Sequence, residues 1–234
     1  LIRALLQNHN RDLFDIYGFD FSTQHDGPYR RDLIEAFSKH FQVDHHSNSD
    51  IASMIQKNEI DILIDLKGYT EGSRPEILFK RPAPIQVNYL GYPGTMGSDA
   101  FDYIIGDPVV TPLDHAEWYS EKIVQLPCCY QPNDPYREVI LPKPKSAYGL
   151  PENKFIFANF NGHNKYTEEA ILAWRSIMES CPSAVLWTLE SGKRTNLVEV
   201  FKHYGFDTSR IVLAKMAAIP HHLGRLRYAD LCLD

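Results

Sequence analysis

Apolar residues recur with two alternating periods along the chain, and together these periods predict an α/β protein. Short β-branched and aromatic runs bounded by turn residues are typical of strands, and apolar residues three and four apart are typical of helices. Their regular alternation indicates helices layered on a mostly parallel sheet. The expected strands are 13–19, 60–65 (a buried one), 85–90, 103–105, 122–126, 155–159, 184–189, 211–214 and 231–233. The expected helices are the opening residues, 31–40, 51–57, 75–80, 167–179 (capped by Thr167), 196–204 (ended by Gly205) and 220–228.

A proline-rich segment divides this pattern into two halves. Residues 127–150 hold five prolines and show no sustained period. Because proline fixes φ and removes a backbone donor, the segment is predicted to be a linker or surface excursion. We therefore expect one domain over 1–145 and a second over 146–234, with a cleft between them as the ligand site. The chain opens on Leu1 and ends in a strand pattern, so we expect it to be a fragment.

Composition narrows the class of function. The chain of 234 residues is 44% hydrophobic with a net charge of -6, which disfavours nucleic acid as a partner. No apolar run reaches the length of a membrane span, and the first residues do not form a secretory signal. The cysteines lack CxxC spacing, which predicts a reducing, cytoplasmic location, and Cys181 and Cys232 are expected to be buried. The tryptophans are expected in or beside the core: Trp118, Trp174 and Trp187.

Two polar segments follow expected strands in the first half. Residues 67–74 combine two glycines with hydroxyl groups and a guanidinium, and residues 90–97 combine three glycines with a proline. In open parallel sheets, ligands bind outside the carboxyl ends of strands. Exposed backbone N–H groups in such loops bind phosphate or sugar hydroxyls. Neither segment is a GxGxxG or P-loop motif, so a structural turn is the alternative for both.

Two further segments lie in the second half. Asn161 and Lys165 precede a helix, where backbone N–H groups, the helix dipole and the lysine predict an anion site. The alternative is a solvated lysine. His221 and His222 face different sides of a helix, so a shared metal is not expected. Arg225 shares the face of His222, whose ring could stack on a nucleotide base; the alternative is a pair of surface histidines.

Taken together, these motifs resemble a known family. They are Gly68-Tyr69-Thr70, Arg81-Pro82-Ala83-Pro84-Ile85-Gln86, Leu90-Gly91-Tyr92-Pro93-Gly94-Thr95, Asp102-Tyr103-Ile104-Ile105, Tyr119-Ser120-Glu121-Lys122, Tyr148-Gly149-Leu150-Pro151-Glu152, Val185-Leu186-Trp187 and Ala229-Asp230-Leu231-Cys232-Leu233-Asp234. The set resembles the catalytic region of the O-linked N-acetylglucosamine transferase family, particularly its bacterial members, over essentially the whole chain. The similar spindly-type O-fucosyltransferases carry Gly-His-Thr and Gly-Tyr-Pro-Asn-Thr at the matching places.

The resemblance implies a fold and an activity. The fold is GT-B, with two Rossmann-like lobes, a nucleotide-sugar in the cleft between them, and both lobes incomplete in this chain. The activity is inverting transfer of N-acetylglucosamine from UDP-GlcNAc to Ser or Thr hydroxyls of an acceptor protein. No cofactor or essential metal is implied, and the parent protein is expected to carry tetratricopeptide repeats.

The resemblance also implies roles for individual residues. Near the sugar and acceptor it places Tyr69, Thr70, Leu90, Gly91 and Pro93. Lys165 matches the family lysine that binds the diphosphate, where a fixed cation stabilises the leaving UDP without proton transfer. His222 matches a contact to uridine and Ala217 a backbone contact to uracil, while Asn161 and Arg225 complete the expected binding set.

Some positions depart from the family pattern and leave alternatives open. Gly162 and Asn164 stand where the family often has Gln and Tyr, and Glu71 replaces a lysine of the animal enzyme. The chain starts after one active-site segment of the family and stops before another, so the isolated chain is expected to be inactive, with the general base outside it. The alternatives are a UDP-glucose or GDP-fucose transferase, a UDP-sugar epimerase, and a non-catalytic nucleotide-sugar-binding remnant.

Overall fold

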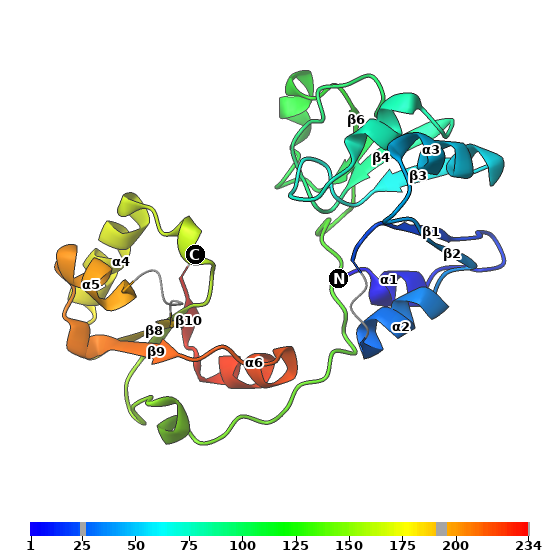
Figure 1. The fold of residues 1–234 in the computed structure, drawn as a ribbon. Helices are drawn as coiled ribbons and strands as arrows, with labels where there is room; N and C mark the ends of the chain where they lie inside the picture. The colour runs from blue at the N-terminus through cyan, green and yellow to red at the C-terminus, as the bar shows by residue number, and fades with distance from the viewer. Residues whose placement is uncertain (24–26, 191–195, 234) are drawn as a thin grey trace. The chain divides into compact units, whose positions relative to one another are not determined.

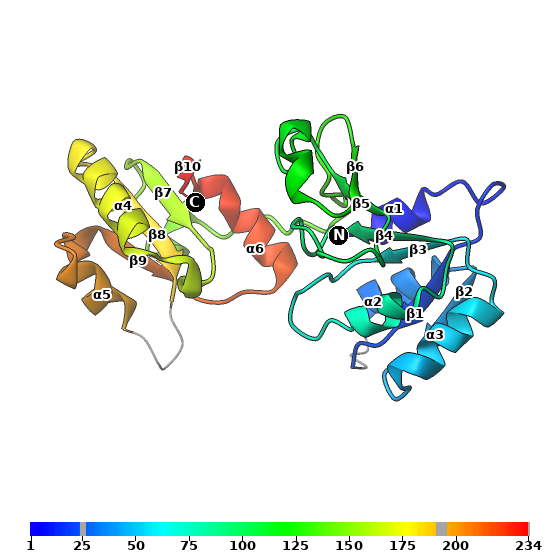
Figure 2. The same cartoon turned by 90° about the horizontal axis from the view of Figure 1, so that it is seen from above.

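The protein consists of two compact units, Leu1–Tyr136 and Arg137–Asp234. The boundary between them along the chain falls within the proline-rich segment. The computed structural model describes residues 1–23, 27–190 and 196–233. The paired strands within each unit run parallel (Figures 1 and 2). This confirms the predicted α/β class. Among the described helices, none is long and apolar enough to cross a membrane.

Unit 1 opens with a two-stranded parallel sheet and two helices. In chain order these are α1 (Arg3–Gln7), β1 (Tyr17–Asp20), α2 (Pro28–Glu35) and β2 (Lys39–Gln42). The strand expected at 13–19 starts later, because Leu13 and Phe14 donate their backbone N–H groups to the Asn10 carbonyl in a turn. The helix expected at 31–40 ends at Glu35. Its last expected residues belong to β2, because pairing with β1 overrides local helix preference.

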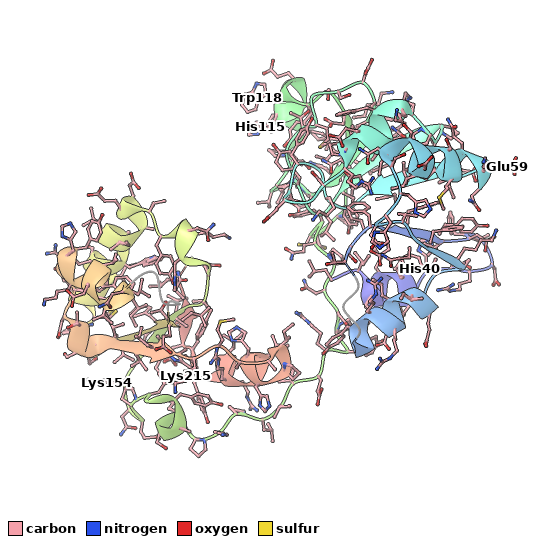
Figure 3. All side chains as sticks on the ribbon, in the orientation of Figure 1. His40, Glu59, His115, Trp118, Lys154 and Lys215 are labelled. Atoms are coloured by element: carbon pink, nitrogen blue, oxygen red, sulfur yellow. The ribbon has the colours of Figure 1, made fainter. Side chains whose placement is uncertain are left out.

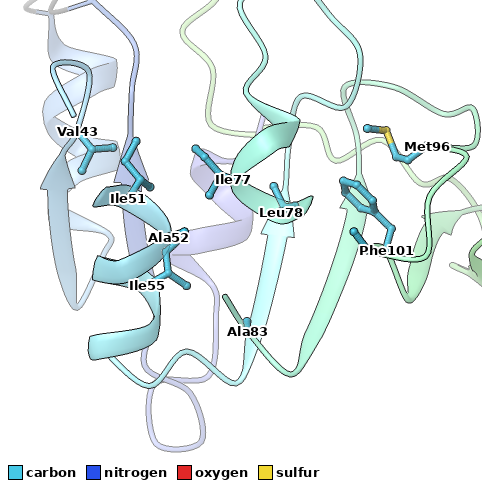
Figure 4. Close-up of a cluster of buried hydrophobic side chains, with 10 residues drawn as sticks. Val43, Ile51, Ala52, Ile55, Ile77, Leu78, Ala83, Met96 and Phe101 are labelled. Carbon is cyan, nitrogen blue, oxygen red and sulfur yellow. The ribbon is translucent and has the colours of Figure 1, made fainter. Parts of the chain in front are cut away.

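A second sheet completes unit 1 in the order β3-β4-β5-β6. The strands are β3 (Ile62–Asp65), β4 (Ile85–Tyr89), β5 (Tyr103–Gly106) and β6 (Lys122–Gln125). Their companions are α3 (Asn48–Lys57), with Ser47 as its cap, and two 3-10 helices, η1 (Pro75–Lys80) and η2 (Leu113–Trp118). One face of the sheet is covered by α3 and η1, which bury Ile51, Ile55, Ile77 and Leu78 (Figure 4).

Two expectations for unit 1 are wrong. The strand at 60–65 was expected to be buried, yet Ile62 is 50% exposed and Ile64 is 46% exposed. The reason is that Ile62 and Ile64 point to one face of this end strand, whereas Leu63 points to the other face and packs against the core under α3 and η1. Trp118 is 63% exposed rather than part of the core. It lies on η2, whose residues are all outside the core, and its ring centroid is 4.4 Å from that of His115 (Figure 3).

Unit 2 is a three-layered α/β unit with the strand order β10-β7-β8-β9. Its strands are β7 (Ile156–Asn159), β8 (Val185–Leu189), β9 (Ile211–Ala214) and β10 (Leu231–Cys232). Its helices are η3 (Lys145–Tyr148), η4 (His163–Lys165), α4 (Glu168–Ser180), α5 (Leu197–His203), η5 (Thr208–Arg210), α6 (Ile219–Arg225) and η6 (Leu226–Tyr228). One core lies under α4 and α5, and a second, around Trp187, lies on the opposite face beside Tyr148 and Tyr228.

Two local signals in unit 2 are confirmed, one at the start of α4 and one after the end of α5. The Thr167 side chain accepts a hydrogen bond from the Ala170 N–H and caps α4. Gly205, with φ of 80°, follows the end of α5 in the left-handed conformation that glycine adopts without strain. The expectation for the cysteines is wrong: Cys232 is exposed and Cys181 is half-buried. Cys232 lies on the end strand of the sheet, which explains its exposure.

Candidate functional site

In unit 1, the loop after β3 is held by the carboxylate that ends the strand. Asp65 accepts the backbone N–H groups of Lys67 at 3.0 Å and Gly68 at 2.9 Å. Burial raises the pKa of Asp65, opposed by these two hydrogen bonds. The Thr70 hydroxyl donates to the Lys67 carbonyl at 2.8 Å. The Asp65 carboxylate therefore shapes the turn, and the hydroxyl of Thr70 is engaged within it.

The loop after β4 packs directly on this first loop. Leu90 has φ of 77°, a left-handed conformation unusual for a residue with a side chain. A Cβ atom on Gly91 would lie 2.3 Å from the Leu66 carbonyl oxygen, so only glycine fits here. Asn88, buried in β4, donates its amide to the carbonyls of Tyr92 and Gly94 at 3.0 and 3.2 Å. These two hydrogen bonds fix the backbone of the loop to strand β4.

Tyr69 joins the two loops. Its hydroxyl donates to the Met96 carbonyl at 2.7 Å, and its ring lies edge-on to Tyr92 at 5.6 Å between centroids. The ring remains half exposed. The structure therefore brings together the five predicted residues of unit 1 on two adjoining loops at the carboxyl ends of β3 and β4. Asn88 was not singled out by the sequence; its only signal is an amide inside an apolar strand.

In unit 2, the predicted loop lies where the strand order reverses. The chain runs from β7 to β8 and β9, and then returns to β10 on the other side of β7. Such a switch point is the usual ligand position in an open α/β sheet. Asn159, buried at the end of β7, donates to the Leu233 carbonyl at 2.9 Å. Its Oδ1 atom accepts from the Asn161 N–H at 2.9 Å and the Tyr166 hydroxyl at 3.0 Å.

Lys165 is exposed at the end of η4, just before α4. Its side chain has no hydrogen-bond or ion-pair partner among the residues the structure describes. The N-terminus of α4 is already occupied, because Thr167 caps it and Glu168 and Glu169 lie in its first turn. Those carboxylates compensate the helix dipole. The ammonium group of Lys165, rather than the dipole expected from the sequence, is therefore the group available to an anion.

A buried arginine organises the second polar group of unit 2. Arg225 is 3% exposed and donates to His222 Nδ1 from Nε at 3.1 Å and from Nη2 at 2.9 Å. Its Nη1 atom donates to the Lys215 carbonyl at 2.7 Å. The guanidinium lies 5.2 Å from the ring centroid of Phe160, which also contacts the His222 ring edge-on at 5.0 Å. Arg225 thus fixes both His222 and the segment before α6.

These contacts determine which form of His222 the protein presents. Burial lowers the pKa of His222, and the positive charge of Arg225 lowers it further. Since Nδ1 accepts from Arg225, the ring proton of the neutral imidazole lies on Nε2. Ala217 is exposed in the segment whose Lys215 carbonyl Arg225 holds. The structure brings Ala217, His222 and Arg225 together. Phe160 contacts Arg225 and His222 and is followed directly by Asn161, so it connects them to the loop of Asn161.

The lowered pKa of His222 predicts a pH dependence of unit 2. The unfolded state takes up a proton near the ordinary histidine pKa of about 6.5, before the folded state does. The free energy of unfolding should therefore fall as the pH drops below about 6.5. Denaturant titrations between pH 7.5 and 5 should show a smaller fall in His222→Gln than in the unsubstituted chain. The neighbouring exposed His221→Gln should behave like the unsubstituted chain, and an unchanged slope in both variants would contradict the assignment.

Each unit thus presents polar loops at the carboxyl ends of parallel strands, which is the usual ligand position in proteins with open α/β sheets. The sequence matches glycosyl transferase family 41 over residues 1–135 and 133–234. It is 38% identical over 245 residues to the probable UDP-N-acetylglucosamine--peptide N-acetylglucosaminyltransferase SEC of Arabidopsis thaliana, covering 100% of this chain and 25% of that protein. It is 25% identical over 355 residues to the UDP-N-acetylglucosamine--peptide N-acetylglucosaminyltransferase of Caenorhabditis elegans, covering 100% of this chain and 30% of that protein.

Among solved structures, a mutant of the O-GlcNAc transferase of Thermobaculum terrenum superposes with a TM-score of 0.88 at 23% identity, covering 99% of this chain and 44% of that one. The chain belongs to glycosyl transferase family 41. The predicted family resemblance and GT-B-type fold are confirmed. The chain spans about a quarter to a third of the length of these two curated relatives.

Proposed function

We propose that this chain is part of the catalytic region of a protein O-GlcNAc transferase. The longer enzyme transfers N-acetylglucosamine from UDP-GlcNAc to Ser or Thr hydroxyls of an acceptor protein, with inversion at the sugar. Family membership supports this proposal, as do the names of the relatives. The observation that carries it is the pair of polar groups in unit 2: a free lysine beside the switch point and a neutral histidine held by a buried arginine.

Unit 2 supplies the nucleotide-binding side of the proposal. The Lys165 ammonium group contacts the diphosphate and stabilises the charge that develops as UDP leaves, without giving up a proton. The His222 ring contacts the uridine, and its Nε2–H is oriented by the Arg225 hydrogen bonds to Nδ1. The backbone at Ala217 contacts uracil, within the segment that Arg225 holds at Lys215. Asn161, fixed by Asn159, completes this set.

Unit 1 supplies the sugar and acceptor side. The residues are Tyr69, Thr70, Leu90, Gly91 and Pro93, on loops fixed to one another by the Tyr69 hydroxyl and the Gly91 contact. In this proposal residues 1–145 belong to the first lobe and residues 146–234 begin the nucleotide-binding lobe. The parent protein works in the cytoplasm and carries tetratricopeptide repeats.

Replacement of Lys165 tests the nucleotide site directly. Calorimetry on the folded chain should show binding of UDP in preference to GDP. Lys165→Ala should weaken UDP binding roughly 10- to 100-fold, because a charge-assisted hydrogen bond contributes about 1.5–3 kcal/mol. Lys154→Ala is the matched control, since this exposed lysine precedes β7 at the opposite end of the strand from Lys165 (Figure 3). Equal losses in the two variants, or no UDP binding by the folded chain, would contradict the assignment.

A further inference from the structure

Unit 1 contains a buried carboxylate that the site residues above do not include. Glu121 precedes β6 and is 4% exposed. It accepts the Met96 N–H at 2.6 Å, the Thr95 hydroxyl at 2.7 Å and the Ser120 hydroxyl at 3.1 Å. No Lys, Arg or His of the described chain forms an ion pair with it. A buried carboxylate without a cation needs such donors, and here they come mainly from the crossover between β4 and β5.

The topology explains why this crossover needs an external acceptor. Residues 90–102 run from the end of β4 to the start of the parallel strand β5 without a helix. The backbone N–H groups of this crossover therefore lack helical partners, and buried ones must be paired by other means. Met96 is buried within this crossover, and Glu121 accepts its N–H group.

The hydroxyl of Thr95 fixes which partner donates and which accepts in its hydrogen bond to Glu121. Thr95 Oγ1 accepts the N–H groups of Gly97 at 3.0 Å and Ser120 at 3.2 Å. With both lone pairs engaged, its own proton must go to Glu121. Ser120 also accepts the Ser98 N–H at 3.1 Å. The acceptor at position 121 must therefore be one that takes several donors and offers none, which a carboxylate does and an amide does not.

The same crossover is hydrogen-bonded to the proposed sugar and acceptor loops. Met96 gives its N–H to Glu121, while its carbonyl accepts the Tyr69 hydroxyl at 2.7 Å. Two positions before Glu121, the Tyr119 hydroxyl donates to the Pro93 carbonyl at 3.3 Å. Displacing the Glu121 side chain would therefore move the anchor of Tyr69 and the end of the loop that carries Leu90, Gly91 and Pro93.

We propose that Glu121 is a positioning residue for the transfer reaction. It does not touch substrate; it holds the Thr95–Met96 peptide so that Tyr69 and the loop at 90–93 keep the geometry that the sugar and acceptor require. This inference rests on the proposed function. The inference adds Glu121 to the proposed function, as a buried residue on which the sugar and acceptor side of the site depends. Glu121 is 25 positions from Met96 in the sequence.

The test is Glu121→Gln in the intact transferase that contains this chain. The NH2 group of the glutamine would face either the Met96 N–H, which is itself a donor, or Thr95 Oγ1, which already accepts two hydrogen bonds. Neither orientation is favourable, so the crossover must shift. A displacement of the reacting groups on the order of 1 Å costs roughly 100-fold in rate, so we expect kcat for GlcNAc transfer to a peptide to fall 10- to 100-fold. UDP affinity should stay within about twofold, because the nucleotide-binding groups lie in unit 2.

Asp107→Asn is the matched control. Asp107 is also buried in unit 1 and accepts three backbone N–H groups, from Val109 at 2.9 Å, Val110 at 2.8 Å and Tyr130 at 2.9 Å. None of these belongs to the loops at 66–74 or 90–97. The proposal predicts that the two substitutions destabilise unit 1 by comparable amounts, but that Asp107→Asn retains its kcat. It also predicts that amide exchange at Met96 is accelerated in Glu121→Gln alone.

Three outcomes would overturn it, and they are distinguishable from failure of the proposed function. Turnover within twofold of the unsubstituted enzyme in Glu121→Gln shows that the position does not matter. Equal losses of kcat in both variants show a general loss of fold. A fall in UDP affinity that accounts for the whole effect places the defect in unit 2. If the unsubstituted enzyme itself transfers no GlcNAc, the proposed function fails first, and the role of Glu121 in transfer falls with it.

Discussion

Replacement of Gly91 by alanine should destabilise unit 1 by about 3 kcal/mol, at the upper end of overpacking costs. The added Cβ would lie 2.3 Å from the Leu66 carbonyl oxygen and 3.1 Å from the Lys67 Cα atom. Both neighbours are backbone atoms, so no side-chain rotation relieves the contact. The loop after β4 must move away from the loop after β3, and the predicted sugar residues on the two loops must separate with it.

Guanidinium titration followed by circular dichroism measures this change, and amide exchange in β4 and β5 assigns it to unit 1. Gly27→Ala is the control, because no atom of the described residues lies within 4 Å of a Cβ atom there. Its free energy of unfolding should change by less than about 0.5 kcal/mol. An equally small change in Gly91→Ala would show that the two loops separate at little cost, and would remove the argument that their contact defines the site.

Replacement of Arg225 by alanine should destabilise unit 2 by about 3–5 kcal/mol, because two buried acceptors lose their donor at about 1–3 kcal/mol each and a cavity is left where the side chain was. The substitution leaves the Lys215 carbonyl and His222 Nδ1 without their donor, and it empties the space beside the Phe160 and Trp187 rings. Lysine is not a conservative substitute, because a single ammonium group cannot reproduce the planar fork of donors that reaches both acceptors.

Tryptophan fluorescence reports this loss specifically. Trp174 and Trp187 are buried in unit 2, whereas Trp118, the only other tryptophan of the chain, is exposed in unit 1. Arg227→Ala, two positions along and exposed, should change the free energy of unfolding of unit 2 by less than about 0.5 kcal/mol. UDP binding should be lost in Arg225→Ala and kept in Arg227→Ala. Retention of both stability and UDP binding in Arg225→Ala would refute its role as the organiser of His222.

The sequence predicted most of the candidate site, because the site residues follow strands that local pattern identifies. Tyr69, Gly91 and Lys165 each stand in a polar segment just after an apolar run. The sequence singled out neither Asn88 nor a role for Glu121, although Glu121 stands in one of the family motifs, because the importance of both depends on partners elsewhere in the chain. An amide inside a strand, and a glutamate before one, carry no local signal of which backbone groups they will meet.

Local physical chemistry in the sequence by itself determined the α/β alternation, the Thr167 cap, the glycine after α5 and the strand at Ile211–Ala214. These features depend on interactions between residues close in sequence, so a short stretch of sequence is enough to predict them. Tertiary structure alone decided that Lys39–Gln42 is a strand, that β3 is exposed, and that Gly91 meets Leu66. Each of these depends on which strands pair and which segments cross, and that choice is made by burial and backbone hydrogen bonding across the whole unit.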